Sequence, residues 1–167
     1  MPRLARRIAL VIALVWASGC GPQLDLAKLQ PTDVLTGWYD AGIKDGLNHL
    51  LPSISFQLKN TDAVPASGVQ LTVSFWQDGA DGENDSFEVK GIGSEAVAPG
   101  ESSAPILVRA EHGYTLEQPR NELFTHSQFK DFTAKLFAKR GGKIVPIGSF
   151  RIDRRVLPHV SAPPGPS

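Results

Sequence analysis

Four acidic residues stand close together near the middle of the chain. Asp78, Asp81, Glu83 and Asp85 fall within eight residues, in a segment that also contains glycine and asparagine. Calcium takes about six to eight oxygen ligands, so such a cluster could hold this ion. The acids are not in the order of an EF-hand loop, and Asp, Asn and Gly are ordinary residues of hairpin loops. We therefore expect a solvated loop and no metal site.

The other residue types with catalytic potential are scattered along the chain. The four histidines include no pair at the i, i+4 spacing of a helical zinc site. The single cysteine cannot supply a multi-cysteine metal site, and no serine stands in a Gly-x-Ser-x-Gly elbow. Glu111, Glu117 and Glu122 lie in an irregular stretch, where solvation explains them better than an acid–base pair. We expect a protein that is not an enzyme and needs no cofactor.

Aromatic residues give the better indication of a functional surface. Several aromatic residues fall at loop edges or on the polar side of a strand pattern, and the candidates are Trp38, Tyr39, Trp76 and Tyr114. Exposed aromatic rings can form a recognition patch for proteins or sugars. A β-sandwich also buries tryptophan in its core, and Trp76 could simply cover an open sheet face. These four residues are the candidate binding patch.

The first twenty residues have the pattern of a targeting segment. Arg3, Arg6 and Arg7 precede a short apolar run over 8–16, which is too short to span a bilayer. Residues 17–20 read Ala-Ser-Gly-Cys and resemble the lipobox of bacterial lipoproteins. The resemblance implies that residues 1–19 are a signal peptide and that Cys20 is diacylated and becomes the new N-terminus. Plain secretion is the alternative.

The resemblance also implies a location. In such lipoproteins an Asp directly after the lipidated cysteine retains the protein at the inner membrane. This chain has Gly21 at that position, so the resemblance favours the outer membrane, with the domain facing the periplasm. Removal of residues 1–19 leaves 14 Lys and Arg against 17 Asp and Glu. This slightly acidic balance argues against nucleic acid as a partner, and membrane attachment would come from acyl chains. With one cysteine, the exported domain cannot contain an internal disulfide.

Two alternating runs dominate the mature chain. Ile54, Phe56 and Leu58 share one face of the first run, and Val69, Leu71, Val73 and Phe75 share one face of the second. The segment 60–68 between them is rich in turn residues. We expect these runs to pair as a hairpin whose apolar face is covered by another sheet.

Further strands are expected at 34–44, 87–92, 104–110, 131–139 and 144–153, with one or two helical turns within 117–124. About seven strands with regular turn signals predict an all-β, antiparallel immunoglobulin-like β-sandwich with one short helical segment. The predicted domain organisation is a signal peptide at 1–19, a lipidated tether at 20–32, the sandwich at 33–157 and a disordered tail at 158–167.

A second resemblance covers residues 53–108. The segments 58–61, 69–79 and 98–101 are similar to small bacterial immunoglobulin-like domains of the FxLYD type, although Phe75-Trp76-Gln77-Asp78 only partly matches the name-giving motif. The resemblance implies the fold and supplies no catalytic residue.

Together these features predict a lipid-anchored, non-enzymatic protein of the cell envelope. It would bind an envelope protein through an edge strand or an aromatic loop face. The alternatives are a carbohydrate- or peptidoglycan-binding module, or weak hydrolase, that uses the aromatic residues with Glu111 or Glu117, and a purely structural lipoprotein.

Overall fold

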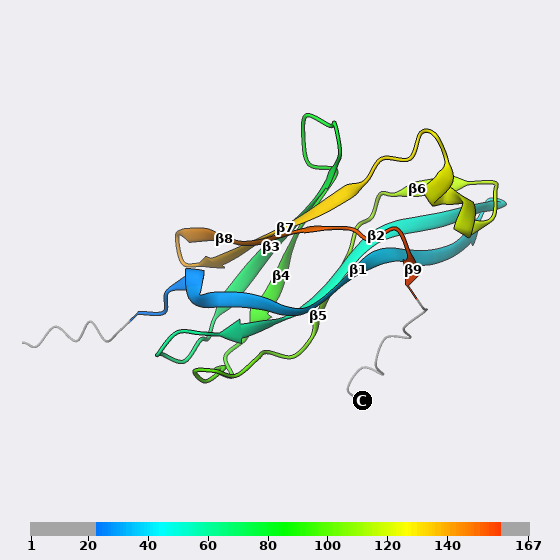
Figure 1. Ribbon diagram of the computed structural model, residues 1–167. Coiled ribbons are helices and arrows are strands. Elements are labelled where there is room, and N and C mark those ends of the chain that lie inside the picture. Colours follow the sequence, from blue (N-terminus) through cyan, green and yellow to red (C-terminus); the bar gives the residue numbers. More distant parts are fainter. Residues whose placement is uncertain (1–22, 158–167) are drawn as a thin grey trace, which may run out of the picture.

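The computed structural model describes residues 23–157, which form two β-sheets packed face to face (Figure 1). The first sheet has the order β5-β2-β1-β9, and β6 also pairs with β2. Its strands are β1 (Leu29–Lys44), β2 (Leu47–Asn60), β5 (Ile106–Arg109), β6 (Tyr114–Leu116) and β9 (Val156–Leu157). The second sheet has the order β4-β3-β7-β8. Its strands are β3 (Val69–Gln77), β4 (Asp85–Ile92), β7 (Phe132–Arg140) and β8 (Lys143–Arg151).

This architecture confirms the predicted all-β sandwich. β1, β2 and β5 lie in one sheet, and β3, β7 and β8 lie in the other with β4 beside β3, as in an immunoglobulin-like sandwich. Each of the seven expected strands is present. β6 and β9 were not predicted, because strands of three and two residues are too short to show alternation. β9 runs parallel to β1, and the other strand pairs are antiparallel.

The predicted hairpin of residues 50–78 is wrong. β2 pairs with β1 through a turn at Asp45 and Gly46, whose φ angles of 53° and 79° suit a tight hairpin turn. β3 pairs with β4 and β7 in the opposite sheet. Leu58 and Leu71 are both fully buried, and both side chains lie against Gly91: a Cβ atom at Gly91 would be 3.3 Å from Leu58 and 2.9 Å from Leu71. The two alternating runs therefore cover each other's apolar faces across the sandwich.

The core consists of alternate side chains from the facing strands. In β2, β3 and β7 the apolar face of each strand is buried: Ile54, Phe56, Leu58, Leu71, Val73, Phe75, Ala134, Leu136 and Ala138. Full burial of one large apolar side chain contributes about 1.5–3 kcal/mol to the free energy of unfolding. This shared core fixes the two sheets against each other without a disulfide.

The described part of the predicted tether, residues 23–32, belongs to the folded domain. Leu24, Leu26 and Leu29 are buried, Leu26 begins the short 3-10 helix η1 (Leu26–Lys28), and β1 starts at Leu29. The Thr61 hydroxyl donates to the carbonyl of Lys28 at 2.7 Å, which holds this start against the loop after β2. The tether prediction failed because a 3-10 turn gives no periodic pattern. Residues 1–22 and 158–167, with Cys20 and the predicted tail, lie outside the described residues.

The β1–β2 hairpin is longer than the sandwich and extends beyond it at one end (Figure 1). β6 and a second 3-10 helix, η2 (Arg120–Thr125), pack against this extension, while η1 lies at the opposite end of the molecule. The predicted helical turns within 117–124 correspond to η2. The Arg120 guanidinium binds the Asp40 carboxylate at 2.7 Å, which ties η2 to β1.

Candidate functional site

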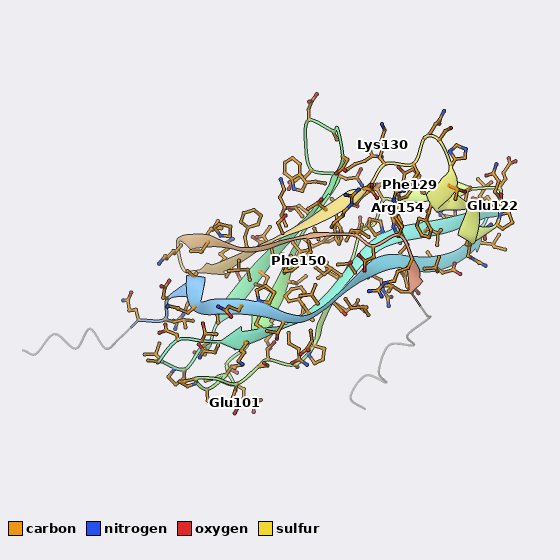
Figure 2. All side chains as sticks on the ribbon, in the orientation of Figure 1. Glu101, Glu122, Phe129, Lys130, Phe150 and Arg154 are labelled. Carbon is orange, nitrogen blue, oxygen red and sulfur yellow. The ribbon has the colours of Figure 1, made fainter. Side chains whose placement is uncertain are left out.

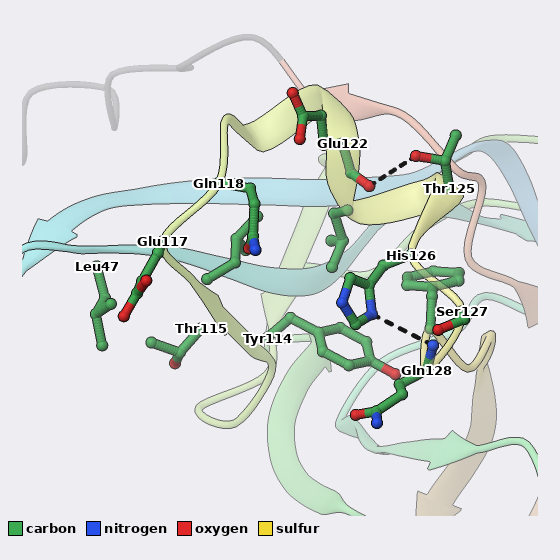
Figure 3. A pocket seen from close by; sticks show the side chains of 13 residues that line it. Leu47, Tyr114, Thr115, Glu117, Gln118, Glu122, Thr125, His126, Ser127 and Gln128 are labelled. Carbon is green, nitrogen blue, oxygen red and sulfur yellow. Dashed lines mark hydrogen bonds between the residues drawn. The ribbon is translucent and has the colours of Figure 1, made fainter.

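A groove of about 700 Å³ lies at the extended end of the β1–β2 hairpin. It is lined by Leu47 and by residues 114–118, 122–123 and 125–129, so β6, η2 and the segment after η2 enclose it (Figure 3). We call this feature the β6 groove. Apart from Leu47 of β2, its lining comes from the stretch of the chain between β5 and β7.

Close packing at Gly113 sets the position of β6. A Cβ atom at Gly113 would lie 2.1 Å from the backbone oxygen of Leu50, so the chain needs glycine where it approaches β2. The next residue, Tyr114, then pairs with Leu50. Beyond β6, the side-chain amide of Asn48 donates to the carbonyl of Gln118 at 3.1 Å. Both ends of β6 are therefore fixed to β2.

An aromatic cluster supports the wall of the β6 groove. The fully buried Trp38 lies 5.5 Å between ring centroids from Tyr114 and from Phe129, both of which line the groove. The Tyr114 hydroxyl accepts from the Lys130 amide at 2.7 Å and from the Gln77 side chain at 3.1 Å. These contacts hold the groove wall against both sheets, so the groove is largely preformed.

The mouth of the β6 groove is polar. Glu117, Gln118, Glu122, His126 and Gln128 are exposed on its lining. The backbone N–H of Gln128 donates to Nδ1 of His126 at 3.3 Å (Figure 3). Because Nδ1 accepts this bond, a neutral His126 ring has its proton on Nε2, which can donate to another group. Among the described lining residues, the charged ones are the two glutamates. The groove offers hydrogen-bonding side chains and two carboxylates.

The outer edge of β6 borders this groove. β6 pairs with β2 on one side. Within residues 117–130 the backbone hydrogen bonds are local, namely Glu122 to Pro119, His126 to Leu123 and Phe129 to His126, and none in the described chain joins this segment to the outer edge of β6. An edge strand leaves alternate N–H and C=O groups directed away from its partner. The strand that lines the groove therefore has an open edge, whose backbone donors and acceptors could pair with an added strand.

The structure does not bring the four predicted patch residues together. Trp38 is 0% exposed, so its prediction as a surface residue is wrong, and it meets Tyr114 inside the aromatic cluster. Tyr39 follows Trp38 in β1 and lies on the outer face of the first sheet, 3.7 Å from the Arg109 guanidinium. Trp76 lies on the outer face of the second sheet, with the Lys135 ammonium 3.8 Å from its ring centre. Consecutive strand residues point to opposite faces, which separates Trp38 from Tyr39.

The acidic loop ends in an ion pair. Asp85, the first residue of β4, is buried, and its carboxylate accepts from the His112 amide at 2.9 Å and lies 2.7 Å from His112 Nδ1. The hydrogen bond to Asp85 and its charge raise the pKa of His112. Within residues 23–157, no group of three or more His, Cys, Asp or Glu side chains is arranged to hold a metal ion. Asp85 thus joins β4 to the loop that leads into β6.

A second buried carboxylate braces the back of the aromatic cluster. Asp131 accepts hydrogen bonds from the guanidinium groups of Arg151 and Arg154, the latter at 2.7 and 2.9 Å. These bonds lower the pKa of Asp131 from 3.8 to about 2, against the opposing effect of burial. Arg154 also lies 5.1 Å from the ring centre of Phe129 (Figure 2). The chain after β8 is thereby fixed beside the groove wall.

Sequence reasoning named Tyr114, Glu117 and Glu122 but missed most of the other residues that line the groove. Residues 117–131, between β6 and β7, form a long connection, and connections of more than about 12–15 residues are uncommon and often functional. That length was the available signal. The short helix η2 has no side-chain N-cap, so its sequence gave little indication of the fold around it.

No known protein family matches this chain. No curated protein matches it significantly either. In the described residues, no helix combines the length and the apolar character needed to cross a membrane. The resemblances to FxLYD-type domains and to lipoproteins therefore stay predictions.

Proposed function

We propose that this chain is a lipid-anchored, non-enzymatic binding module of the bacterial cell envelope, and that it holds an envelope protein in the β6 groove. The observation that carries the proposal is the open edge of β6 inside a groove of about 700 Å³. An extended peptide can add to such an edge, because its backbone completes the ladder while its side chains enter the adjacent groove. Residues 114–116 supply the edge, and η2 supplies the opposite wall.

The position of the predicted lipid supports this function. Cys20 precedes the described chain by three residues, and that chain starts beside η1, at the opposite end of the molecule from η2 (Figure 1). β1 alone has 16 residues and spans about 50 Å at the usual rise of a strand. Acyl chains on Cys20 would hold the η1 end at the membrane. The groove would then project away from the bilayer, toward other envelope components.

Carbohydrate is the second candidate ligand, because the lining includes two amide side chains and two carboxylates, from Gln118, Gln128, Glu117 and Glu122. Such groups suit the hydroxyls of a glycan. The aromatic rings favour the peptide, since Tyr114 and Phe129 pack against each other, 5.3 Å between centroids, and against Trp38. Sugar stacking requires an accessible ring face. Glu111 of the hydrolase alternative is not part of the lining.

Photo-cross-linking in the native envelope tests the proposal. A photoreactive residue at Gln118 or at Gln128 samples the groove, and the same residue at Ser149, on the exposed strand β8, is the matched control. We expect one discrete protein adduct from both groove positions and none from Ser149. Equal adducts from all three positions, or no protein adduct from the groove, would contradict the proposal.

A further inference from the structure

We infer that the β6 groove selects a basic segment, that is, an extended peptide whose lysine or arginine side chains pair with Glu117 and Glu122. This inference rests on the proposed function, because it defines the chemistry of the partner at the same site. Three features of the groove carry it: the two carboxylates of its lining, the pairing of the nearby arginines and the apolar part of the lining.

The charge of the lining has one sign. Glu117 and Glu122 are exposed in the groove, and the described lining contains no Lys or Arg. In Figure 3, Glu117 lies on the side of Leu47 and Glu122 belongs to η2. The two carboxylates therefore come from different walls. Each carboxylate stands at the rim of the groove, where it can attract a positive side chain of a bound strand.

The two arginines near the groove are already paired, whereas Lys130, which follows the lining residue Phe129, is exposed. Arg120 of η2 binds Asp40 at 2.7 Å, and Arg154 binds Asp131 behind the aromatic cluster. Each pair neutralises its own arginine, so neither cancels the charge of Glu117 or Glu122. Among the described residues, neither Glu117 nor Glu122 forms an ion pair, in contrast to Asp40 and Asp131. They are available to a ligand.

The apolar part of the lining suits the stems of long cationic side chains. Leu47, Leu116, Leu123 and Phe129 line the groove together with the ring of Tyr114. Lysine and arginine bury their methylene stems along such surface while the charged group stays at the polar rim. A peptide strand that alternates small and basic residues would place every second side chain on the same face. Short neutral or acidic segments lack one or both of these contacts.

Peptide titrations of the full chain in mild detergent test the inference. The probes are three blocked pentapeptides that alternate valine with lysine, with serine or with glutamate, and a tetrasaccharide of N-acetylglucosamine. Amide NMR shifts of residues 114–118 report on the groove, and affinities come from the same titrations. We expect the lysine peptide to bind at least about tenfold more tightly than the serine peptide at low salt, and this preference to shrink in high salt.

Matched charge variants identify the residues responsible. Glu117→Gln with Glu122→Gln should abolish the preference for lysine. Glu95→Gln with Glu101→Gln removes the same charge elsewhere and should leave the preference unchanged, because Glu101 lies at the other end of the molecule from Glu122 (Figure 2). Both control residues are exposed.

The outcomes separate the two proposals. If the three peptides shift the groove amides with equal affinity, the charge selection is wrong and the groove remains a peptide site. If the double groove variant keeps the lysine preference, the assignment to Glu117 and Glu122 is overturned. Shifts from the tetrasaccharide alone, or from none of the probes, would contradict both the basic-segment inference and the proposed peptide-binding function.

Discussion

The ring centroids of Trp38 and Tyr114 lie 5.5 Å apart, and this contact joins the long strand β1 to the short strand β6. Trp38 also contacts Phe124, Phe129 and Phe132, with ring centroids 5.5–6.3 Å away. One buried side chain thereby connects β1 with η2, with the groove wall and with the start of β7. The shape of the β6 groove depends on it.

Trp38→Ala should be strongly destabilising. Removal of a buried tryptophan leaves a cavity and costs about 3–5 kcal/mol in the free energy of unfolding. Trp76→Ala is the control, since Trp76 lies on an outer sheet face against Lys135 and its loss should cost about 1 kcal/mol or less. Urea unfolding followed by circular dichroism measures both. Equal losses would show that the aromatic cluster is not a structural centre.

Gly113→Ala tests the close approach of β6 to β2. The new Cβ would lie 2.1 Å from the backbone oxygen of Leu50, so the backbone must move, at an expected cost of about 2 kcal/mol. Gly142→Ala is the matched control, because a Cβ there meets no atom within 4 Å. Urea unfolding gives the stability difference, and the amide shifts of residues 114–118 should move in the first variant alone. An unperturbed β6 in Gly113→Ala would contradict this account.

The sequence predicted strands and their apolar faces well, and pairing poorly. The alternation at Ile54, Phe56 and Leu58 correctly identified a face directed to the core. Alternation does not reveal which strand lies beside another, so β2 and β3 were wrongly joined although they face each other across the core. The turn residues in 60–68 are compatible with a loop that crosses from one sheet to the other, as well as with a hairpin turn.

The candidate site was less predictable than the fold. Trp38 and Tyr39 could not share a face of a strand, and alternation alone would have separated them. His126 and Gln128 reach the groove because η2 and the segment after it fold back on β6. A 3-10 helix of six residues has no sustained period, and the tertiary contacts Arg120–Asp40 and Asn48–Gln118 that position it join residues far apart in sequence.

Acid should weaken the fold through Asp131. Its pKa is lowered from 3.8 to about 2 by Arg154 and Arg151, so the stabilisation is complete above about pH 5 and is lost as the pH falls from about 4 to about 2. A pKa shift of this size corresponds to about 2 kcal/mol in the free energy of unfolding. Urea unfolding at several pH values measures it. Asp131→Asn should be less stable at neutral pH and should lose this acid-dependent component; an identical pH dependence in both proteins would contradict the assignment.

His112 should titrate above the usual value of 6.5, because the hydrogen bond and charge of Asp85 favour the imidazolium. A raised folded pKa means that this contribution is fully present below pH 6.5 and is lost as the pH rises through the raised pKa. NMR titration of the His112 ring measures it directly. Asp85→Asn should return the pKa of His112 toward 6.5. A His112 pKa that is insensitive to this substitution would rule out the ion pair in solution.

Cys20→Ser should release the protein from the membrane fraction. Serine cannot form the thioether of a lipoprotein anchor, and acyl chains contribute about 0.8 kcal/mol per buried CH₂ group, far more than a slightly acidic domain could gain from lipid headgroups. Fractionation of cells, with mass spectrometry of the N-terminal peptide, measures both attachment and modification. Glu95→Gln is the control and should stay membrane-bound. Retention of Cys20→Ser in the membrane would show that attachment does not depend on this residue, and would remove the reason to expect the β6 groove to project away from the bilayer.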